Sequence, residues 1–369
     1  MANDMNIQEV AEKAPRLRSK KGHERRVNAS IYAILIVMSI IWLCPFVFLV
    51  LQSFRGESGG QVAYVIPKQW TLDNYRFLFE GVAFQLNALI KSVPAIILTA
   101  VTNLAGIAGI VACLKRKPKN PFEEKQNNFK SAALVFGLLL LVNVIRCVDS
   151  TNCDFVRWFM NTLTIALFCA VIQTIMVLSV SYTLSRMRFK GRKLIMNVVL
   201  VLGMFPGFLT MIVLYYLLKM MGLTQAGAVP GLILISCASS GMGYYISKGF
   251  FDTIPKSLDE SARIDGATRF HVFLKIIMPM AKPIVIYTIL MAFMGPWGDY
   301  VFASYVAFGH KASYNVAVGL YRWVNTNDYQ GYFTRFCAGG VLVAIPITAL
   351  FMALQKYYVE GVTGGAVKG

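Results

Sequence analysis

Long apolar runs separated by short polar segments make up most of this chain. An α-helix rises 1.5 Å per residue and a bilayer core is about 30 Å thick, so about 20 apolar residues cross it. The runs therefore predict an all-α polytopic membrane protein with about eight transmembrane helices. The predicted spans are residues 29–53, 87–114, 131–148, 159–184, 194–218, 229–246, 283–302 and 334–356.

Composition and charge agree with this fold class. Of the 369 residues, 56% are hydrophobic and 15% charged, whereas a soluble domain has about 25% charged residues. The net charge of +18 would also suit a nucleic-acid partner. With the N-terminus inside, however, 26 of the 36 lysines and arginines lie in inside segments, which is the bias of cytoplasmic loops. Both termini are therefore expected in the cytoplasm, and no nucleic-acid partner is needed.

The first 28 residues are polar and basic. We expect a disordered cytoplasmic tail that fixes the orientation of the first span. That span, 29–53, is longer than the apolar core of a signal peptide, and no A-x-A-like site follows it. It is therefore expected to be an uncleaved start-transfer helix.

Several local patterns predict breaks and helix starts. The fifth span contains GMFPGF, with Gly203, Pro206 and Gly207, which predicts a break that serves either as a kink or as a cavity-lining hinge. Thr71 begins TLDNY and predicts the start of a short amphipathic helix outside the membrane. Asp299 lies at a span end and is expected to be interfacial.

Seven cysteines are scattered along the chain, without a C-x-x-C pair that would suggest a metal site. Cys147 and Cys153 lie together in CVDSTNC at a predicted external end. Either a small disulfide loop or two free thiols fits this spacing.

A polar segment of about thirty residues, 255–283, stands out late in the apolar sequence. Its first half predicts a short helix, with Thr253 as the N-cap, Pro255 in the first turn and Gly266 as the left-handed stop. A second helix is expected from Thr268, with an apolar stripe at helical spacing. The stripe consists of Phe270, Phe273, Leu274 and Ile277. Read from the residues alone, the unit is either a generic amphipathic loop or an element that docks a partner.

The sequence ESARIDGA followed by IIMP is similar to the EAA loop of ABC-importer permeases. Two departures are conservative, because Ser261 replaces an alanine and Met278 replaces a leucine. The matching positions are Glu260, Ser261, Ala262, Gly266, Ile276 and Pro279.

Within that superfamily the chain resembles the carbohydrate permeases of the MalG type, for maltose and maltodextrin. TLDNY at 71–75, NTL at 161–163, SRMRFKGRK at 185–193 and GVTGGAVKG at 361–369 carry the resemblance. MalG-type permeases have six spans, so residues 83–153 are identified as an inserted helix pair. The expected organisation is the tail 1–28 and a permease domain 29–369, which includes the coupling loop 247–282 and a C-terminal tail 357–369.

The resemblance implies a permease subunit in a bacterial cytoplasmic membrane that is not itself an enzyme. Its partners would be a MalF-like second permease, a MalK-like ATPase dimer that holds ATP and magnesium, an extracytoplasmic sugar-binding protein and the lipid bilayer. The chain has no GxxxxGK[ST] phosphate loop. The resemblance assigns ATPase coupling to Glu260, Ser261, Ala262, Asp265, Gly266 and Pro279, and a further ATPase contact to Gly364, Gly365, Val367, Lys368 and Gly369.

The sequence indicates the transported substrate less clearly than the source of energy. Polar and aromatic residues in or beside the spans are candidates for a substrate pathway, although ordinary helix packing explains each of them. These are Asn161, Gln173, Tyr182 and Trp297. An ABC permease for another sugar, a secondary transporter and a membrane scaffold are the alternatives. A secondary transporter would need paired ionisable residues at mid-membrane, whereas Lys91 and Arg335 are isolated and lie near span ends.

Overall fold

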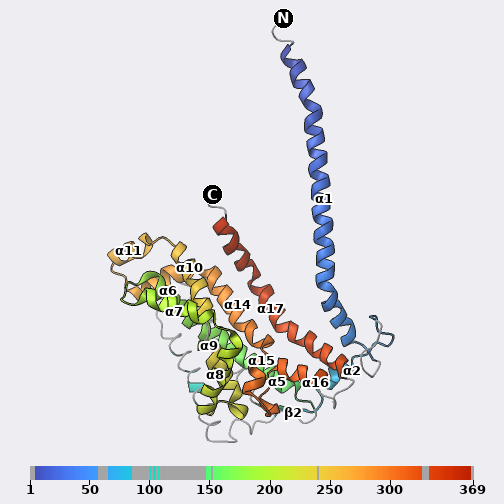
Figure 1. Ribbon diagram of the computed structural model, residues 1–369, viewed down its shortest axis with the longest axis vertical. Coiled ribbons are helices and arrows are strands. Elements are labelled where there is room, and N and C mark those ends of the chain that lie inside the picture. Colours follow the sequence, from blue (N-terminus) through green and yellow to red (C-terminus); the bar gives the residue numbers. More distant parts are fainter. Residues whose placement is uncertain are drawn as a thin grey trace.

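The computed structural model is built almost entirely from helices (Figure 1). It describes residues 5–56, 65–84, 147–150, 153–238, 241–325 and 332–366, with single positions between 100 and 111. The longer helices are α1 (Met5–Ser53), α5 (Phe155–Phe168), α6 (Thr174–Arg186), α7 (Arg192–Gly203), α8 (Gly207–Met220), α9 (Ala228–Ala238), α10 (Gly241–Thr253), α14 (Lys282–Gly298), α16 (Val316–Asn325) and α17 (Phe333–Ala366). The shorter ones are α2 (Asp73–Leu78), α11 (Ser257–Ile264), α12 (Arg269–Val272), α13 (Met278–Met280), α15 (Val301–Val306), the π-helical turns η2 (Cys169–Gln173) and η4 (Phe273–Ile277), and the 3₁₀ turns η3 (Gln225–Gly227) and η5 (Lys311–Ser313).

Within the described residues, four helical stretches are long and apolar enough to cross a membrane, or six if two bent pairs each count as one span. The stretches are Val27–Ser53, Phe155–Arg186, Gln225–Thr253 and Phe333–Gln355. The bent pairs are Arg192–Gly203 with Gly207–Met220, and Arg269–Met280 with Lys282–Gly298. These six correspond to six of the eight predicted spans. The other two, 87–114 and 131–148, lie outside the described residues apart from single positions.

The predicted break in the fifth span is confirmed. Helix α7 ends at Gly203, α8 begins at Gly207, and the two meet at 103°. Pro206 lies between them in an extended conformation; proline donates no hydrogen bond and disfavours a helical residue before it. Among the described residues no atom lies within 4 Å of a Cβ built on Gly203 or Gly207. The break therefore depends on the proline and not on close packing at the glycines.

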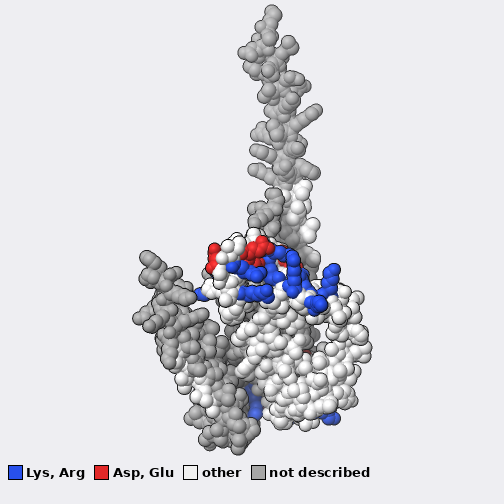
Figure 2. Space-filling view, turned by 90° about the vertical axis from the view of Figure 1, so that its left-hand side faces the viewer, with Lys and Arg blue, Asp and Glu red and all other residues white. Residues whose placement is uncertain are grey.

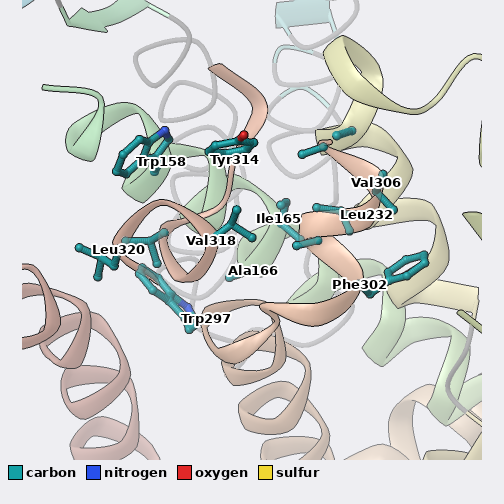
Figure 3. Packing of buried hydrophobic residues seen from close by; sticks show 14 of the residues in the cluster. Trp158, Ile165, Ala166, Leu232, Trp297, Phe302, Val306, Tyr314, Val318 and Leu320 are labelled. Atoms are coloured by element: carbon teal, nitrogen blue, oxygen red, sulfur yellow. The ribbon is translucent and has the colours of Figure 1, made fainter. Parts of the chain in front are cut away.

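Two separate groups of buried side chains hold the helices together. The large core joins α5, α9, α14, α15 and α16, and Figure 3 shows its side chains interdigitating around Ile165 and Val318. Helix α16 approaches α5 so closely that a Cβ on Gly319 would lie 2.0 Å from the Trp158 ring. The small core joins α6, α10, α11, α12 and α14. It consists of Leu178, Tyr182, Phe251, Ile254, Ala262, Val272, Ile277, Ala281 and Ile284.

The start of α1 and the end of α17 lie at the same end of the molecule as α11 (Figure 1). Helix α2, strand β2 and α16 lie at the opposite end. Residues 5–28 continue α1 as helix, so the prediction of a disordered tail is wrong. Helix α1 packs on α17 near its own C-terminal end, where Leu49 lies against Gly340.

The two ends of the segment expected to be inserted, 83–153, lie side by side. Strand β1 (Val82–Phe84) pairs antiparallel with β2 (Val148–Ser150), with Val82 opposite Ser150. This two-stranded ribbon adds a feature to the all-α expectation. Cys147 and Cys153 beside it are buried free thiols, so the disulfide alternative is excluded. Burial raises the pKa of the Cys153 thiol to about 11.

Candidate functional site

The polar segment after α10 folds as a short helix, a glycine turn and a second, interrupted helix. Helix α11 ends in a paired turn, in which Ala267 N–H donates to Ala262 O at 3.0 Å and Gly266 N–H to Arg263 O at 3.1 Å. Gly266 has a φ of +80°, which L-residues with a Cβ disfavour. The predicted left-handed stop is therefore confirmed.

The start of α11 differs from the prediction. Thr253 is the last residue of α10, and its Oγ1 donates to Phe250 O at 2.7 Å, so Thr253 does not cap α11. The N-cap is Lys256, whose side chain makes no capping bond. The first turn contains Asp259 and Glu260, whose negative charges interact favourably with the positive end of the helix dipole.

One side of α11 is attached to the protein and the other is open. Ala262 is 8% exposed and belongs to the small core. Glu260, Ser261 and Asp265 are exposed, and the apolar Ile264 is 86% exposed. Two of the predicted coupling residues, Glu260 and Asp265, thus present carboxylates outward, and Ile264, which was not predicted, presents a large apolar side chain beside them.

The second helix begins where expected but buries a different face. Thr268 caps α12, because its Oγ1 accepts from His271 N–H at 3.3 Å. Val272 and Ile277 are buried, whereas Phe270 is 70% exposed and Leu274 is 42% exposed. The predicted stripe is therefore wrong at two of its four positions.

The physical reason is the π-helical turn η4. A π-helix bonds each residue to the fifth one along, and the two buried residues are five apart. Pro279 follows in α13; its ring would clash with the carbonyl four residues before it in a regular α-helix. The chain then turns by 85° into α14.

An arginine that sequence reasoning missed joins this unit to the membrane helices. Arg186 Nη2 donates to Phe251 O at 2.8 Å and to Ile254 O at 2.6 Å, at the end of α10. Its Nη1 lies 3.2 Å from Asp259 Oδ2 on α11. In the sequence, Arg186 is one of five basic residues in 185–193. Such a cluster indicates which side of the membrane the loop lies on, and it does not single out Arg186.

The substrate-pathway candidates lie in different surroundings. Tyr182 belongs to the small core and donates to Asp259 Oδ1 at 3.3 Å. Asn161 Nδ2 donates to Ala312 O and Tyr314 O, both at 2.9 Å, and so holds a loop. Gln173 ends the π-helical turn η2 and is half-buried.

Trp297 is the fourth candidate and packs in the large core. It is 4% exposed, its ring stands edge-on to Phe159 at 5.2 Å, and its Nε1–H has no acceptor among the described residues. Asp299 follows it at the end of α14, as expected, and its Oδ1 accepts from Phe302 N–H at 3.2 Å.

The predicted C-terminal contact residues are only partly described. Residues 357–366 continue α17 as helix, and this stretch includes Gly364 and Gly365. Val367, Lys368 and Gly369 lie outside the described residues.

Comparison with known proteins agrees with this architecture. The family model of the binding-protein-dependent transport system inner membrane component matches residues 175–364. The galactooligosaccharide transport permease GanQ of Bacillus subtilis (strain 168) is 38% identical over 217 residues, which cover 58% of this chain and 75% of GanQ. The maltodextrin transport permease MalD of Streptococcus pneumoniae (strain ATCC BAA-255 / R6) is 36% identical over 222 residues, with coverages of 58% and 75%.

A solved structure shares the fold. It is the crystal structure of a bacterial ABC transporter involved in the import of the acidic polysaccharide alginate, with a TM-score of 0.55 and 17% identity. The match covers 90% of this chain and 97% of that chain. The chain therefore belongs to the family of binding-protein-dependent transport system inner membrane components, as a multi-pass cytoplasmic-membrane permease similar to the MalG-type sugar permeases.

Proposed function

We propose that this chain is one of two permease subunits of an importer that moves an oligosaccharide into the cytoplasm. ATP hydrolysis on partner ATPase subunits supplies the energy. Two findings support this assignment: the family match over residues 175–364 and the absence of a phosphate loop from the sequence.

The exposed face of α11 is the observation that carries the proposal. Ile264 is 86% exposed beside the exposed carboxylates of Glu260 and Asp265, and burying such an apolar side chain against a partner would favour binding by about 25 cal/mol for each Å² covered. The helix is nevertheless fixed to the protein through Ala262. A rigid helix with such a face suits docking into a groove of an ATPase subunit.

Charge supports the orientation of the docking face. Figure 2 shows lysines and arginines gathered in a band at the end of the molecule that carries α11, with acidic side chains beside them. Basic residues concentrate on the cytoplasmic side of membrane proteins. The α11 end, with both termini, is therefore assigned to the cytoplasm, where the end of α17 also approaches the ATPases. The opposite end would receive the sugar-binding protein.

The second permease is assigned to the surface around α7. None of the twelve described residues of α7 is buried, although residues 194–196 and 198–202 are apolar. Such a face is stable only in lipid or against another membrane protein. A MalF-like partner covering this face would complete the membrane part of the importer.

The cargo is assigned as an oligosaccharide, with maltodextrin favoured. GanQ is named for galactooligosaccharides and MalD for maltodextrin, at nearly equal identity to this chain. A galactooligosaccharide is therefore the second candidate. The candidates for contact with the sugar stay the aromatic and amide side chains in or beside the spans, because aromatic rings suit sugar ring faces and amides suit sugar hydroxyls. These are Asn161, Gln173, Tyr182 and Trp297.

Reconstitution tests the assignment. The chain, a MalF-like permease, a MalK-like ATPase and a sugar-binding protein are placed in proteoliposomes, and uptake of labelled maltodextrin and galactooligosaccharide is measured with ATP inside. We expect uptake that requires ATP and the binding protein. Uptake by this chain alone without ATP would instead support a secondary transporter.

Variants locate the docking face in the same assay. Glu260→Gln should weaken co-purification of the ATPase and lower ATP-driven uptake. Glu80→Gln is the matched control, because Glu80 is also an exposed carboxylate and follows α2 at the opposite end of the molecule. Equal behaviour of the two variants would argue against α11 as the ATPase contact.

A further inference from the structure

Arg186 contacts two elements at once, the end of α10 and the first turn of α11, from the last turn of α6. Its guanidinium donates to the carbonyls of Phe251 and Ile254 at 2.8 and 2.6 Å and lies 3.2 Å from Asp259. The hydroxyl of Tyr182, one turn earlier on α6, donates to the same carboxylate at 3.3 Å. The end of α6 thereby holds both the end of α10 and the first turn of α11.

These contacts bury both charges. The side chains of Arg186 and Asp259 are 6% and 16% exposed. Nη1 and Oδ2 are close but not aligned as a hydrogen bond, so the pair is held by its opposite charges. A buried charge that loses its partner is strongly destabilised, and a cation at a helix C-terminus also gains from the helix dipole. The contact is therefore specific to a cation at position 186.

Helix α6, which ends at Arg186, is the half of the stretch Phe155–Arg186 that lies nearest α11. The outer half of this stretch, which begins at Phe155, lies toward the opposite end of the protein (Figure 1). At the outer half, Trp158 Nε1 donates to Lys311 O at 2.9 Å, and Thr162 Oγ1 accepts from Val316 N–H at 2.8 Å. The same stretch is thus bonded to α11 at one end and to the loop 311–316 at the other, with the π-helical turn η2 between them.

We propose that Arg186 is a positioning residue that locks α11 to this stretch. A displacement that an ATPase subunit applies to α11 then moves Phe155–Arg186 as a unit, and through it the loop at the opposite end of the membrane domain. Without the lock, α11 moves against the small core and the displacement is lost. The inference rests on the proposed function as an ATP-driven importer.

The test compares Arg186→Gln with Arg188→Gln in the assembled importer in proteoliposomes. Arg188 lies two residues further on, is exposed and carries the same charge, so it is the matched control. Sugar uptake and ATP hydrolysis are measured in the same vesicles. In Arg186→Gln we expect uptake per ATP to fall about 5-fold or more, the lower bound of a typical allosteric coupling, while ATP hydrolysis continues. Arg188→Gln should keep the wild-type ratio.

Two further variants separate a lock from a general structural role. Arg186→Lys keeps the charge but has one ammonium in place of a planar fork, so it should recover part of the ratio. Asp259→Asn keeps the side-chain shape and should lower the ratio as well. If the two groups act as a pair, Arg186→Gln with Asp259→Asn should be no worse than the worse single variant. Additive losses would overturn the pairing.

Hydrogen exchange gives a readout that needs no transport. In lipid nanodiscs, Arg186→Gln should speed exchange of the amides in 257–266 and leave α14 and α16 unchanged, whereas Arg188→Gln should change neither. If the wild-type importer takes up no sugar, the proposed function fails, and this experiment still decides whether the lock exists. Unchanged exchange, or faster exchange throughout the chain, would overturn the inference. Should Arg186→Gln not fold, Asp259→Asn decides the same question.

Discussion

Asn74 joins three helices through one side chain. Its Nδ2 donates to Ser53 O at 3.0 Å and to Arg55 O at 2.8 Å, where α1 ends. Its Oδ1 accepts from Thr334 Oγ1 at 2.9 Å, in the first turn of α17. Thr71 fixes the same turn, because its Oγ1 accepts from Asp73 N–H at 3.1 Å. The TLDNY motif, met first as part of a resemblance, is therefore a hydrogen-bonded junction of α1, α2 and α17.

Replacing Asn74 with alanine should destabilise this junction. The change leaves the buried carbonyls of Ser53 and Arg55 without their donor, at a cost of about 1–3 kcal/mol. Thermal unfolding in detergent should show a lower midpoint than wild type. Arg76→Ala is the control, because the Arg76 side chain forms an exposed ion pair with Asp73, which is worth about 0–1 kcal/mol. Equal midpoints for the two variants would show that the junction is not important for stability.

Gly266 is needed for its conformation and not for space. Its φ is +80°, and no described atom lies within 4 Å of a Cβ built there. Gly266→Val should therefore cost about 1–2 kcal/mol through the backbone alone, loosen the end of α11 and lower sugar uptake per ATP. Gly266→Asn should stay close to wild type, because asparagine tolerates the left-handed region. The ratio of uptake to ATP hydrolysis checks both; equal loss in both variants would mean that the turn is not the cause.

Helices in this protein are interrupted where their sequence prevents regular hydrogen bonding. Pro206 separates α7 from α8, and Pro279 follows the π-helical turn η4. The two helices at each interruption meet at a large angle, 103° and 85° respectively. Hydropathy predicted one span across the first interruption, whereas it placed the helix before the second interruption in a polar segment and began the span only at residue 283.

Removing Pro206 should straighten the element that it divides. In Pro206→Ala the missing N–H is restored and residue 205 is free to become helical, so α7 and α8 should approach one continuous helix. Spin labels on the two helices should then report a longer separation, and ATP-driven uptake should fall while the protein still folds. Gly207→Ala is the control, since no described atom lies within 4 Å of its new Cβ. An unchanged separation in Pro206→Ala would show that packing, not the proline, sets the bend.

The described elements divide into two ends joined by long helices. Helix α11, the start of α1 and the end of α17 lie at one end, and α2, α16 and the ribbon β1–β2 at the other (Figure 1). The ribbon closes the base of the segment 83–153, since Val82 lies opposite Ser150. An insertion whose two ends already meet can be added to a fold without moving its neighbours.

Deleting this segment should therefore leave α11 and its contacts with the rest of the protein intact. Residues 83–149 are replaced by Asn-Gly, which suits a two-residue turn between Val82 and Ser150. The shortened chain should still co-purify with the ATPase and show the same exchange in α11 as the full chain. A folded deletion variant that no longer binds the ATPase would refute the idea that the segment is an independent addition.

The sequence by itself determined the features that depend on solvent and on local backbone chemistry. An apolar run favours lipid whatever its tertiary contacts, so hydropathy predicted the four to six stretches that are long and apolar enough to cross a membrane among the described residues. Gly266 and Pro206 act through their own φ angle and missing N–H, so their effects could be read in place. The family followed from the coupling-loop motif, which residues 260–279 carry as one contiguous segment.

Only the tertiary structure decided which charges are buried and which helix faces meet. Arg186 and Asp259 are distant in sequence, and each looked like one solvated charge among several until folding placed them 3.2 Å apart. Phe270 and Leu274 have the spacing of a buried stripe, but they are exposed. The π-helical turn η4 shifts the helix faces, so that Val272 and Ile277 are buried instead. Residues 5–28 had the composition of a disordered tail and yet continue α1 as helix. Spacing along the chain predicts a face only while the helix stays regular, and it says nothing about which partner that face will find.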